Sequence, residues 1–262
     1  MSRMKRNRIS RYGAGRIRNS PSQCRLHIPS PRAILRSGTF VSVRTFYRRH
    51  LPHYQPPEAT YFVTFRLAGS LPGETIERLK QERVRTLQQI AGTKENERRA
   101  EEFHNYQISY FEQFDELLDR STVSPQWLND DRIAKIVVDT IHHFLAHPHQ
   151  LLCFCIMPNH VHLICKPCNL VDRVSSVRLV SPYESFPLTR ILRRIKGATA
   201  RQANLILRRQ GAFWQHESYD RVIRDGEELE MTLWYVLNNP VKARLVDEWQ
   251  KWPWTYCNPS IM

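Results

Sequence analysis

Two histidines separated by a single residue, His160 and His162, have the spacing with the clearest chemical use in this chain. Residues 151–157 and 160–166 are short apolar runs joined by Pro158 and Asn159, which predicts a β-hairpin with a tight turn. Side chains alternate along a strand, so both imidazoles project from one face, about 7 Å apart along the chain. They could converge on one cation, either Mn²⁺ or Zn²⁺, or Mg²⁺ where oxygen ligands complete the shell. Two packing or surface histidines have the same spacing, so the pair alone does not decide.

A tyrosine and an asparagine four residues apart, Tyr235 and Asn239, form a second pair. The helix that carries them is predicted to begin at Asp225, which has capping-box spacing with Glu228. It is predicted to end near Asn239, because Pro240 disfavours helical geometry in the residue before it. At about 100° per residue the two side chains lie about 40° apart, on a less buried face than the apolar stripe. That stripe consists of Leu229, Leu233, Val236 and Leu237.

This i, i+4 relation would let the amide oxygen of Asn239 join a cation while the Tyr235 phenol stands nearby as a nucleophile. The alternative is structural: the tyrosine packs along the helix edge and the asparagine caps the helix before the proline.

A basic helix is predicted over residues 188–209, with no acidic residue between Glu184 and Glu217. Its cations are candidate DNA contacts and comprise Arg190, Arg193, Arg194, Lys196, Arg201, Arg208 and Arg209. Four of them recur at intervals of four and seven residues and form one stripe suited to a nucleic-acid backbone, namely Arg190, Arg194, Arg201 and Arg208. A solvated basic face is the alternative. Three aromatic side chains could stack on unpaired bases, namely Phe213, Trp214 and Tyr219, although core packing is expected for at least one of them. Arg224 is a further candidate DNA contact.

The remaining pattern predicts an α+β domain over residues 51–258, with an antiparallel sheet backed by helices in a ferredoxin-like arrangement. A first strand is expected at residues 60–67, and a loop followed by a strand is expected at 213–223. Residues 74–119 are predicted to be an insertion of two helices with a break near Gly92, and a further helix is predicted at 131–145. Residues 1–50 hold 13 of the 39 Lys and Arg residues and none of the 25 acidic ones. They predict a disordered basic arm, which would attract phosphate backbones without reading sequence or would only be solvated.

Composition excludes several classes of protein, since 41% apolar and 24% charged residues do not suit a disordered, collagenous or coiled-coil chain. No run approaches the roughly 18 apolar residues of a membrane span, and the N-terminus lacks a secretory apolar run. We expect a cytoplasmic protein, associated with the nucleoid when bound to DNA, with no membrane partner.

Cys165 and Cys168 form one CxxC motif without a second pair, which is weak as a metal site. Extended backbone would carry both cysteines away from the imidazoles of His160 and His162.

Five segments in order carry a resemblance: 157–164 (MPNHVHLI), 213–215 (FWQ), 219–225 (YDRVIRD), 235–243 (YVLNNPVKA) and 252–254 (WPW). Together they resemble the REP-associated tyrosine transposases, which belong to the insertion-sequence-200-like, single-tyrosine branch of the HUH endonuclease superfamily. The likeness spans residues 54–256, while the arm at 1–50 and the insertion at 74–119 are not part of the minimal family pattern.

This resemblance implies a ferredoxin-like fold, a bound Mg²⁺ or Mn²⁺, and transposition by cleavage and rejoining of single-stranded, hairpin-forming DNA. The reaction would pass through a 5′-phosphotyrosine. Carried across by position, His160 and His162 are the metal-binding pair, Tyr235 is the nucleophile and Asn239 is the third metal ligand. The enzyme would act as a monomer or homodimer. Two other classes remain open: a catalytically silent protein that binds DNA hairpins, and a structural zinc protein.

Overall fold

The computed structural model describes residues 46–48, 52–54, 56, 59–121, 124–146, 150–167 and 187–261. Its strands are β1 (Phe46–Arg48), β2 (Pro52–Tyr54), β3 (Thr60–Arg66), β4 (Leu151–Ile156), β5 (His160–Cys165), β6 (Tyr219–Ile223) and β7 (Thr255–Cys257). Its helices are α1 (Gly73–Ala91), α2 (Asn96–Asp119), α3 (Asp131–Phe144), α4 (Pro187–Ile206) and α5 (Gly226–Lys242). Among the described residues, none of these helices has the length and apolarity needed to cross a membrane.

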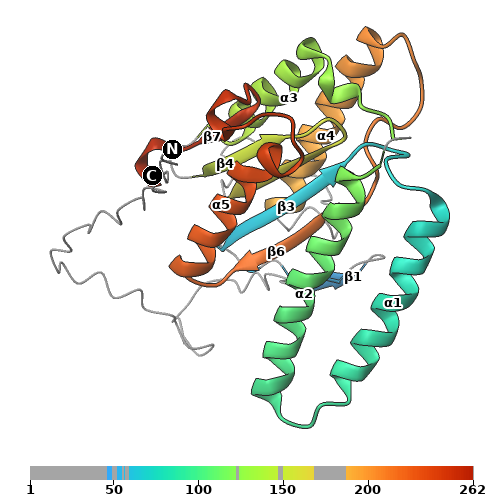
Figure 1. The fold of residues 1–262 in the computed structure, drawn as a ribbon, viewed down its shortest axis with the longest axis vertical. Coiled ribbons are helices and arrows are strands. Elements are labelled where there is room, and N and C mark those ends of the chain that lie inside the picture. The colour runs from blue at the N-terminus through green and yellow to red at the C-terminus, as the bar shows by residue number, and fades with distance from the viewer. Residues whose placement is uncertain are drawn as a thin grey trace, which may run out of the picture. The chain divides into compact units, whose positions relative to one another are not determined.

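Five strands form one antiparallel sheet in the order β6-β3-β5-β4-β7 (Figure 1). The connections from β3 to β4 and from β5 to β6 each skip one strand, which is the ferredoxin-like arrangement, and β7 extends its edge. The α+β prediction is therefore confirmed. β1 and β2 pair separately and β1 falls within the predicted arm, whereas residues 1–45 lie outside the described residues.

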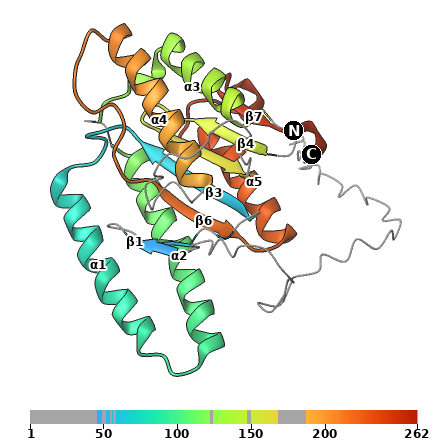
Figure 2. The same ribbon diagram turned by 180° about the vertical axis from the view of Figure 1, so that it is seen from behind.

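Helices cover both faces of the sheet, and strand alternation assigns side chains to each face (Figures 1 and 2). Val161 and Leu163 of β5 pack in one core with residues of α3 and α4. Ile164 packs in a second core with residues of α1, α2 and α5. Because His160 and His162 share the face of Ile164, they lie on the side covered by α2 and α5.

The predicted helix starts were closer to the structure than the predicted helix ends. Asp225 caps α5 by accepting a hydrogen bond from the Glu228 backbone N–H at 2.8 Å. The predicted end near Asn239 is wrong, since α5 continues through Pro240 to Lys242. A proline in the last turn removes only one backbone donor, and the Asn239 carbonyl still accepts from the Ala243 N–H at 2.9 Å.

Candidate metal and tyrosine site

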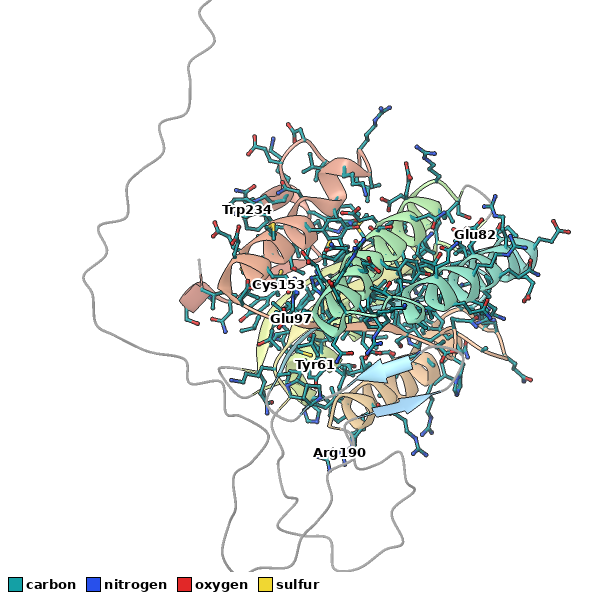
Figure 3. All side chains as sticks on the ribbon, turned by 90° about the horizontal axis from the view of Figure 1, so that it is seen from below. Tyr61, Glu82, Glu97, Cys153, Arg190 and Trp234 are labelled. Carbon is teal, nitrogen blue, oxygen red and sulfur yellow. The ribbon has the colours of Figure 1, made fainter. Side chains whose placement is uncertain are left out.

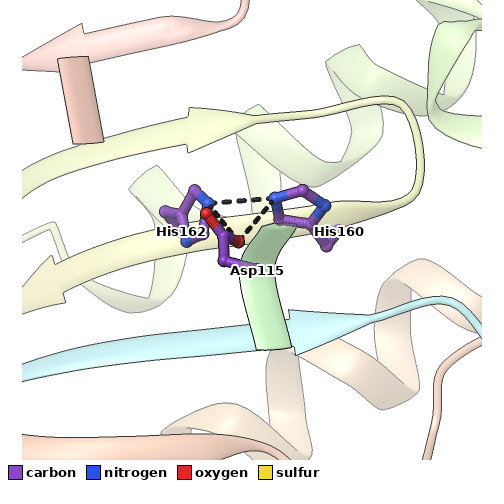
Figure 4. A group of neighbouring side chains, drawn as sticks. All are labelled: Asp115, His160 and His162. Carbon is purple, nitrogen blue, oxygen red and sulfur yellow. Dashed lines mark hydrogen bonds and ion pairs between the residues drawn. The ribbon is translucent and has the colours of Figure 1, made fainter. Parts of the chain in front are cut away.

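The sheet brings the two histidines into contact. In the pairing of β3 with β5, His162 lies opposite Thr64 and His160 lies opposite Arg66. The two Nε2 atoms are 2.9 Å apart, and both side chains are fully buried (Figure 4). The predicted convergence of the two imidazoles on one point is therefore observed.

Hydrogen bonds on the far side of each ring fix the direction in which Nε2 points. The Asn159 amide donates Nδ2–H to the Leu118 carbonyl and to Ser124 Oγ, both at 2.9 Å, so its Oδ1 faces His160 Nδ1 at 2.6 Å. Since an amide oxygen only accepts, Nδ1 carries the hydrogen and Nε2 presents a lone pair in the neutral ring. His162 Nδ1 similarly lies 2.8 Å from Thr64 Oγ1. Outer partners of this kind orient metal-binding histidines.

A carboxylate that the sequence analysis did not single out completes the cluster. Asp115, on α2, is fully buried, and its Oδ1 lies 3.2 Å from His162 Nε2 and 3.4 Å from His160 Nε2 (Figure 4). A signal was present in the sequence, because Asp115 falls at helical spacing between the buried side chains of Phe111 and Leu118. A carboxylate within an apolar stripe is costly to bury without partners, and it therefore marks a candidate site.

Helix α5 supplies the Tyr235 phenol to this cluster. The Tyr235 hydroxyl donates to Asp115 Oδ2, and the Asn239 amide donates to the same oxygen at 3.1 Å. The Tyr235 ring centroid lies 5.9 Å from that of His162. Tyr235 and Asn239 were predicted to lie on a less buried face of this helix. That prediction is wrong for Asn239, which is fully buried because α2 covers this side of α5. Tyr235 is only partly buried.

The residues present fit a divalent metal ion. Asp115, His160 and His162 each offer one ligand atom, and these atoms all lie within 4.8 Å of one another. Ligands about 2.1 Å from one ion and about 90–110° apart are separated by about 3.0–3.4 Å, close to the spacings given above. Two buried oxygens support the fit, because neither Asp115 Oδ1 nor Asn239 Oδ1 accepts a hydrogen bond. The predicted use of Asn239 as an oxygen ligand is compatible with this geometry.

The electrostatic surroundings keep His160 neutral and the Tyr235 phenol protonated. Burial, followed by the neighbouring His162, lowers the pKa of His160 to about 3, which favours the neutral form that binds metals. Burial alone would raise the pKa of Asp115, but His162 and His160 outweigh it and hold that pKa below its usual value. Burial and then the Asp115 carboxylate raise the pKa of Tyr235 well above its usual value.

The predicted DNA contacts on the basic helix do not surround this site. α4 packs with α3 on the other face of the sheet, and Figure 3 places Arg190 of α4 and Trp234 of α5 on opposite sides of the sheet. Arg193, Arg194 and Arg201 are exposed on α4, and Arg190 is partly buried.

Two other predicted contacts of the basic helix, Arg208 and Lys196, have different surroundings from those predicted. Arg208 does not belong to the helical stripe, because α4 ends at Ile206 and Arg208 has a φ of 51°. The Lys196 ammonium donates to the carbonyls of Gln215 at 2.6 Å and His216 at 2.9 Å, and therefore holds the loop before β6.

Trp214 packs in the core instead of stacking on bases. Its Nε1–H donates to Thr199 Oγ1 at 2.8 Å, and its ring meets that of Phe65 edge to face. Phe213 and Tyr219 are buried as well. Arg224 is exposed, and its Nε lies 3.4 Å from Glu228 Oε2.

The alternative zinc site with two cysteines is not assembled by the described residues. Cys165 is buried in the core on the other face of the sheet from His160 and His162. This agrees with the expectation that extended backbone separates them, and Cys168 lies outside the described residues.

No protein-family model matches the chain. A curated protein of Haemophilus influenzae, named as a REP-associated tyrosine transposase, is 27% identical over 135 residues, which cover 48% of this chain and 73% of that protein. This chain is similar to REP-associated tyrosine transposases. A solved structure of a REP-associated tyrosine transposase bound to a REP hairpin aligns over 80% of each chain, with 16% identity and a TM-score of 0.41.

Proposed function

We propose that this chain is a metal-dependent endonuclease and transposase, which cleaves and rejoins single-stranded, hairpin-forming DNA through a 5′-phosphotyrosine on Tyr235. The proposal is carried by one observation: the Tyr235 hydroxyl contacts Asp115, whose other carboxylate oxygen lies beside the two histidine Nε2 atoms. A nucleophile and a set of metal ligands thus meet at one side chain. The ordered motifs and the name of the curated relative support the same class of reaction.

The reaction requires one bond to form and one to break. Tyr235 Oη attacks the phosphorus, and the bond from phosphorus to the 3′ oxygen of the upstream nucleotide breaks. The upstream strand takes up a proton and leaves with a 3′-hydroxyl, while the downstream strand stays attached through its 5′ phosphate. A DNA 3′-hydroxyl can reverse the step, with the phenol as leaving group, so rejoining needs no ATP.

The residues of the site have distinct tasks in this scheme. Asp115 Oδ2 accepts the hydrogen bond of the Tyr235 hydroxyl and is therefore placed to receive its proton. The raised pKa of Tyr235 keeps the phenol protonated until positive charge enters the site. When held by His160, His162 and Asp115, with Asn239 Oδ1 as a further ligand, Mg²⁺ or Mn²⁺ would stabilise negative charge on the phosphate oxygens.

The test is a denaturing gel with a single-stranded oligonucleotide that contains a hairpin and carries a label at its 3′ end. With Mn²⁺, the protein is expected to acquire the label as a covalent adduct, whereas a strand labelled at its 5′ end is released with a free 3′-hydroxyl. Tyr235→Phe removes only the nucleophilic oxygen, so it should bind the oligonucleotide and form no adduct. An adduct of equal yield in Tyr235→Phe would overturn the assignment.

A catalytically silent hairpin-binding protein is the second candidate, and the burial of the site favours it. His160, His162, Asp115 and Asn239 are all 0% exposed, so a phosphate reaches them only if α2 or its side chains move. Hairpin binding by the unaltered protein, without an adduct in either Mg²⁺ or Mn²⁺, would select this function.

A further inference from the structure

Two buried arginines lie on the same side of the sheet as the metal and tyrosine site. Arg66 on β3 is the cross-strand partner of His160, and Arg83 is on the inner face of α1. Each is 5% exposed. Among the described residues, no carboxylate forms an ion pair with either guanidinium, unlike the buried Arg221, which pairs with Glu228. Burying a cation without a counter-ion is costly, so this arrangement requires an explanation.

The contacts of these arginines are mostly aromatic. The Arg66 guanidinium lies 5.6 Å from the ring centroid of Phe114, and Nη1 donates to Ser70 Oγ at 2.9 Å. The Arg83 guanidinium lies 4.8 Å from the ring centroid of Tyr110. The Tyr110 and Phe114 rings stack with their centroids 6.3 Å apart, so the two guanidiniums contact neighbouring rings of one aromatic cluster.

Several hydrogen-bond donors around Arg83 have no partner. Arg83 Nε and Nη1 are buried and have no hydrogen-bond partner. The Tyr106 hydroxyl is buried without a partner as well, and its ring centroid lies 5.8 Å from that of Tyr110, which Arg83 contacts. An anion with several oxygens would satisfy these donors and balance the charge of both arginines. Phe114, which contacts Arg66, directly precedes Asp115 in the chain, so this cluster adjoins the metal and tyrosine site.

We propose that Arg66, Arg83 and the Tyr106 hydroxyl form a phosphate subsite, which binds a backbone phosphate of the DNA strand next to the phosphate that Tyr235 attacks. The second half of this statement rests on the proposed function. α1 lies along α2, and the far ends of both helices extend beyond the sheet (Figures 1 and 2). An outward movement of α1 would therefore open the cluster to DNA without disturbing the strands that hold the histidines. The helical insertion would then supply both Asp115 and part of the DNA-binding surface.

The first test measures binding of a hairpin oligonucleotide with single-stranded flanks, in the presence of a chelator so that no cleavage occurs. Arg83→Met is compared with Arg85→Met, an exposed arginine two residues further along the same helix. Loss of a charge-assisted phosphate contact should weaken binding about tenfold or more. It should also reduce the slope of log affinity against log salt by about 0.7, the value for one phosphate of a single strand. Equal affinities and slopes for the two variants would overturn the proposal.

The second test changes the DNA and leaves the protein intact. A neutral methylphosphonate replaces each flanking phosphate in turn, and binding is measured with the unaltered protein and with Arg83→Met. One linkage should weaken the unaltered protein about tenfold and have no effect on Arg83→Met, which is the coupling expected of a direct contact. Arg83→Lys replaces the variant if Arg83→Met does not fold, because it keeps the charge and loses the paired donors of the guanidinium. A scan in which no linkage affects the unaltered protein would overturn the subsite.

The two proposals fail in different ways. Phosphate-specific binding through Arg83 without a covalent adduct would leave the subsite standing and remove the nuclease function. An adduct on Tyr235, together with identical DNA binding by Arg83→Met and Arg85→Met, would leave the nuclease function standing and remove the subsite.

Discussion

Replacing Asp115 with asparagine removes one negative charge from the site, exchanges one carboxylate oxygen for an NH₂ group and nearly preserves the size of the side chain. Asp115 Oδ1 lies 3.2 and 3.4 Å from the two histidine Nε2 atoms, so it is a direct neighbour of any ion seated between them. Loss of a residue one shell further out typically weakens metal binding by about 10–100-fold. Loss of this anionic ligand should therefore cost at least about 100-fold in Mn²⁺ affinity, or about 2.7 kcal/mol.

Thermal unfolding at increasing MnCl₂ concentration measures this difference. At a free Mn²⁺ concentration of about 100 times the Kd of the unaltered protein, binding stabilises the native state by about 2.7 kcal/mol, and a 100-fold weaker variant gains only about 0.4 kcal/mol. At about 2–4 °C per kcal/mol for a domain of this size, the Tm should rise about 5–11 °C in the unaltered protein and about 1 °C in Asp115→Asn. Glu116→Gln, the exposed neighbour on the same helix, is the control. An equal rise in Asp115→Asn would refute the assignment of Asp115 as a ligand.

Three further outcomes are expected. Asn159→Ala removes the acceptor that orients His160 and should weaken Mn²⁺ binding about 10–100-fold by calorimetry, a prediction that unchanged affinity would contradict. Arg221→Met breaks the buried pair with Glu228 and should lower the free energy of unfolding by about 3 kcal/mol in urea titrations, whereas the exposed Arg224→Met should change it by less than about 1 kcal/mol. Because the pKa of His160 is lowered to about 3 in the folded protein, only the unfolded chain takes up this proton as the pH falls below about 6.5. Metal-free stability should then decrease by up to about 1.4 kcal/mol per pH unit between about pH 6 and 4, and a His160→Gln variant with the same slope would exclude this cause.

Strand and helix periodicity were sufficient to predict one half of the site. The alternation of a strand places His160 and His162 on one face whatever the rest of the fold does, and the i, i+4 relation does the same for Tyr235 and Asn239 on α5. These relations depend only on local backbone geometry, which explains why they could be read directly from spacing.

The other half depends on long-range packing that spacing does not encode. Asp115 enters the site because α2 packs across β5 and α5, so an element predicted as a mere insertion contributes a central residue. The same holds for the basic helix: its spacing does not indicate that α4 packs on the other face of the sheet from this site. The core position of Trp214 could not be predicted from spacing, because an indole that hydrogen-bonds to Thr199 in the core and one that stacks on a base look the same in sequence.

Peptide mapping tests the central claim most directly, which is that Tyr235 is the residue that attacks DNA beside the metal ligands. The protein is incubated with a hairpin oligonucleotide and Mn²⁺, digested with nuclease and protease, and analysed by mass spectrometry. The expected result is a nucleotide linked through its 5′ phosphate to the peptide that contains Tyr235, and its absence from His160→Ala and Asp115→Asn. A nucleotide on a different tyrosine, or on the Tyr235 peptide in equal yield without the metal ligands, would contradict this account.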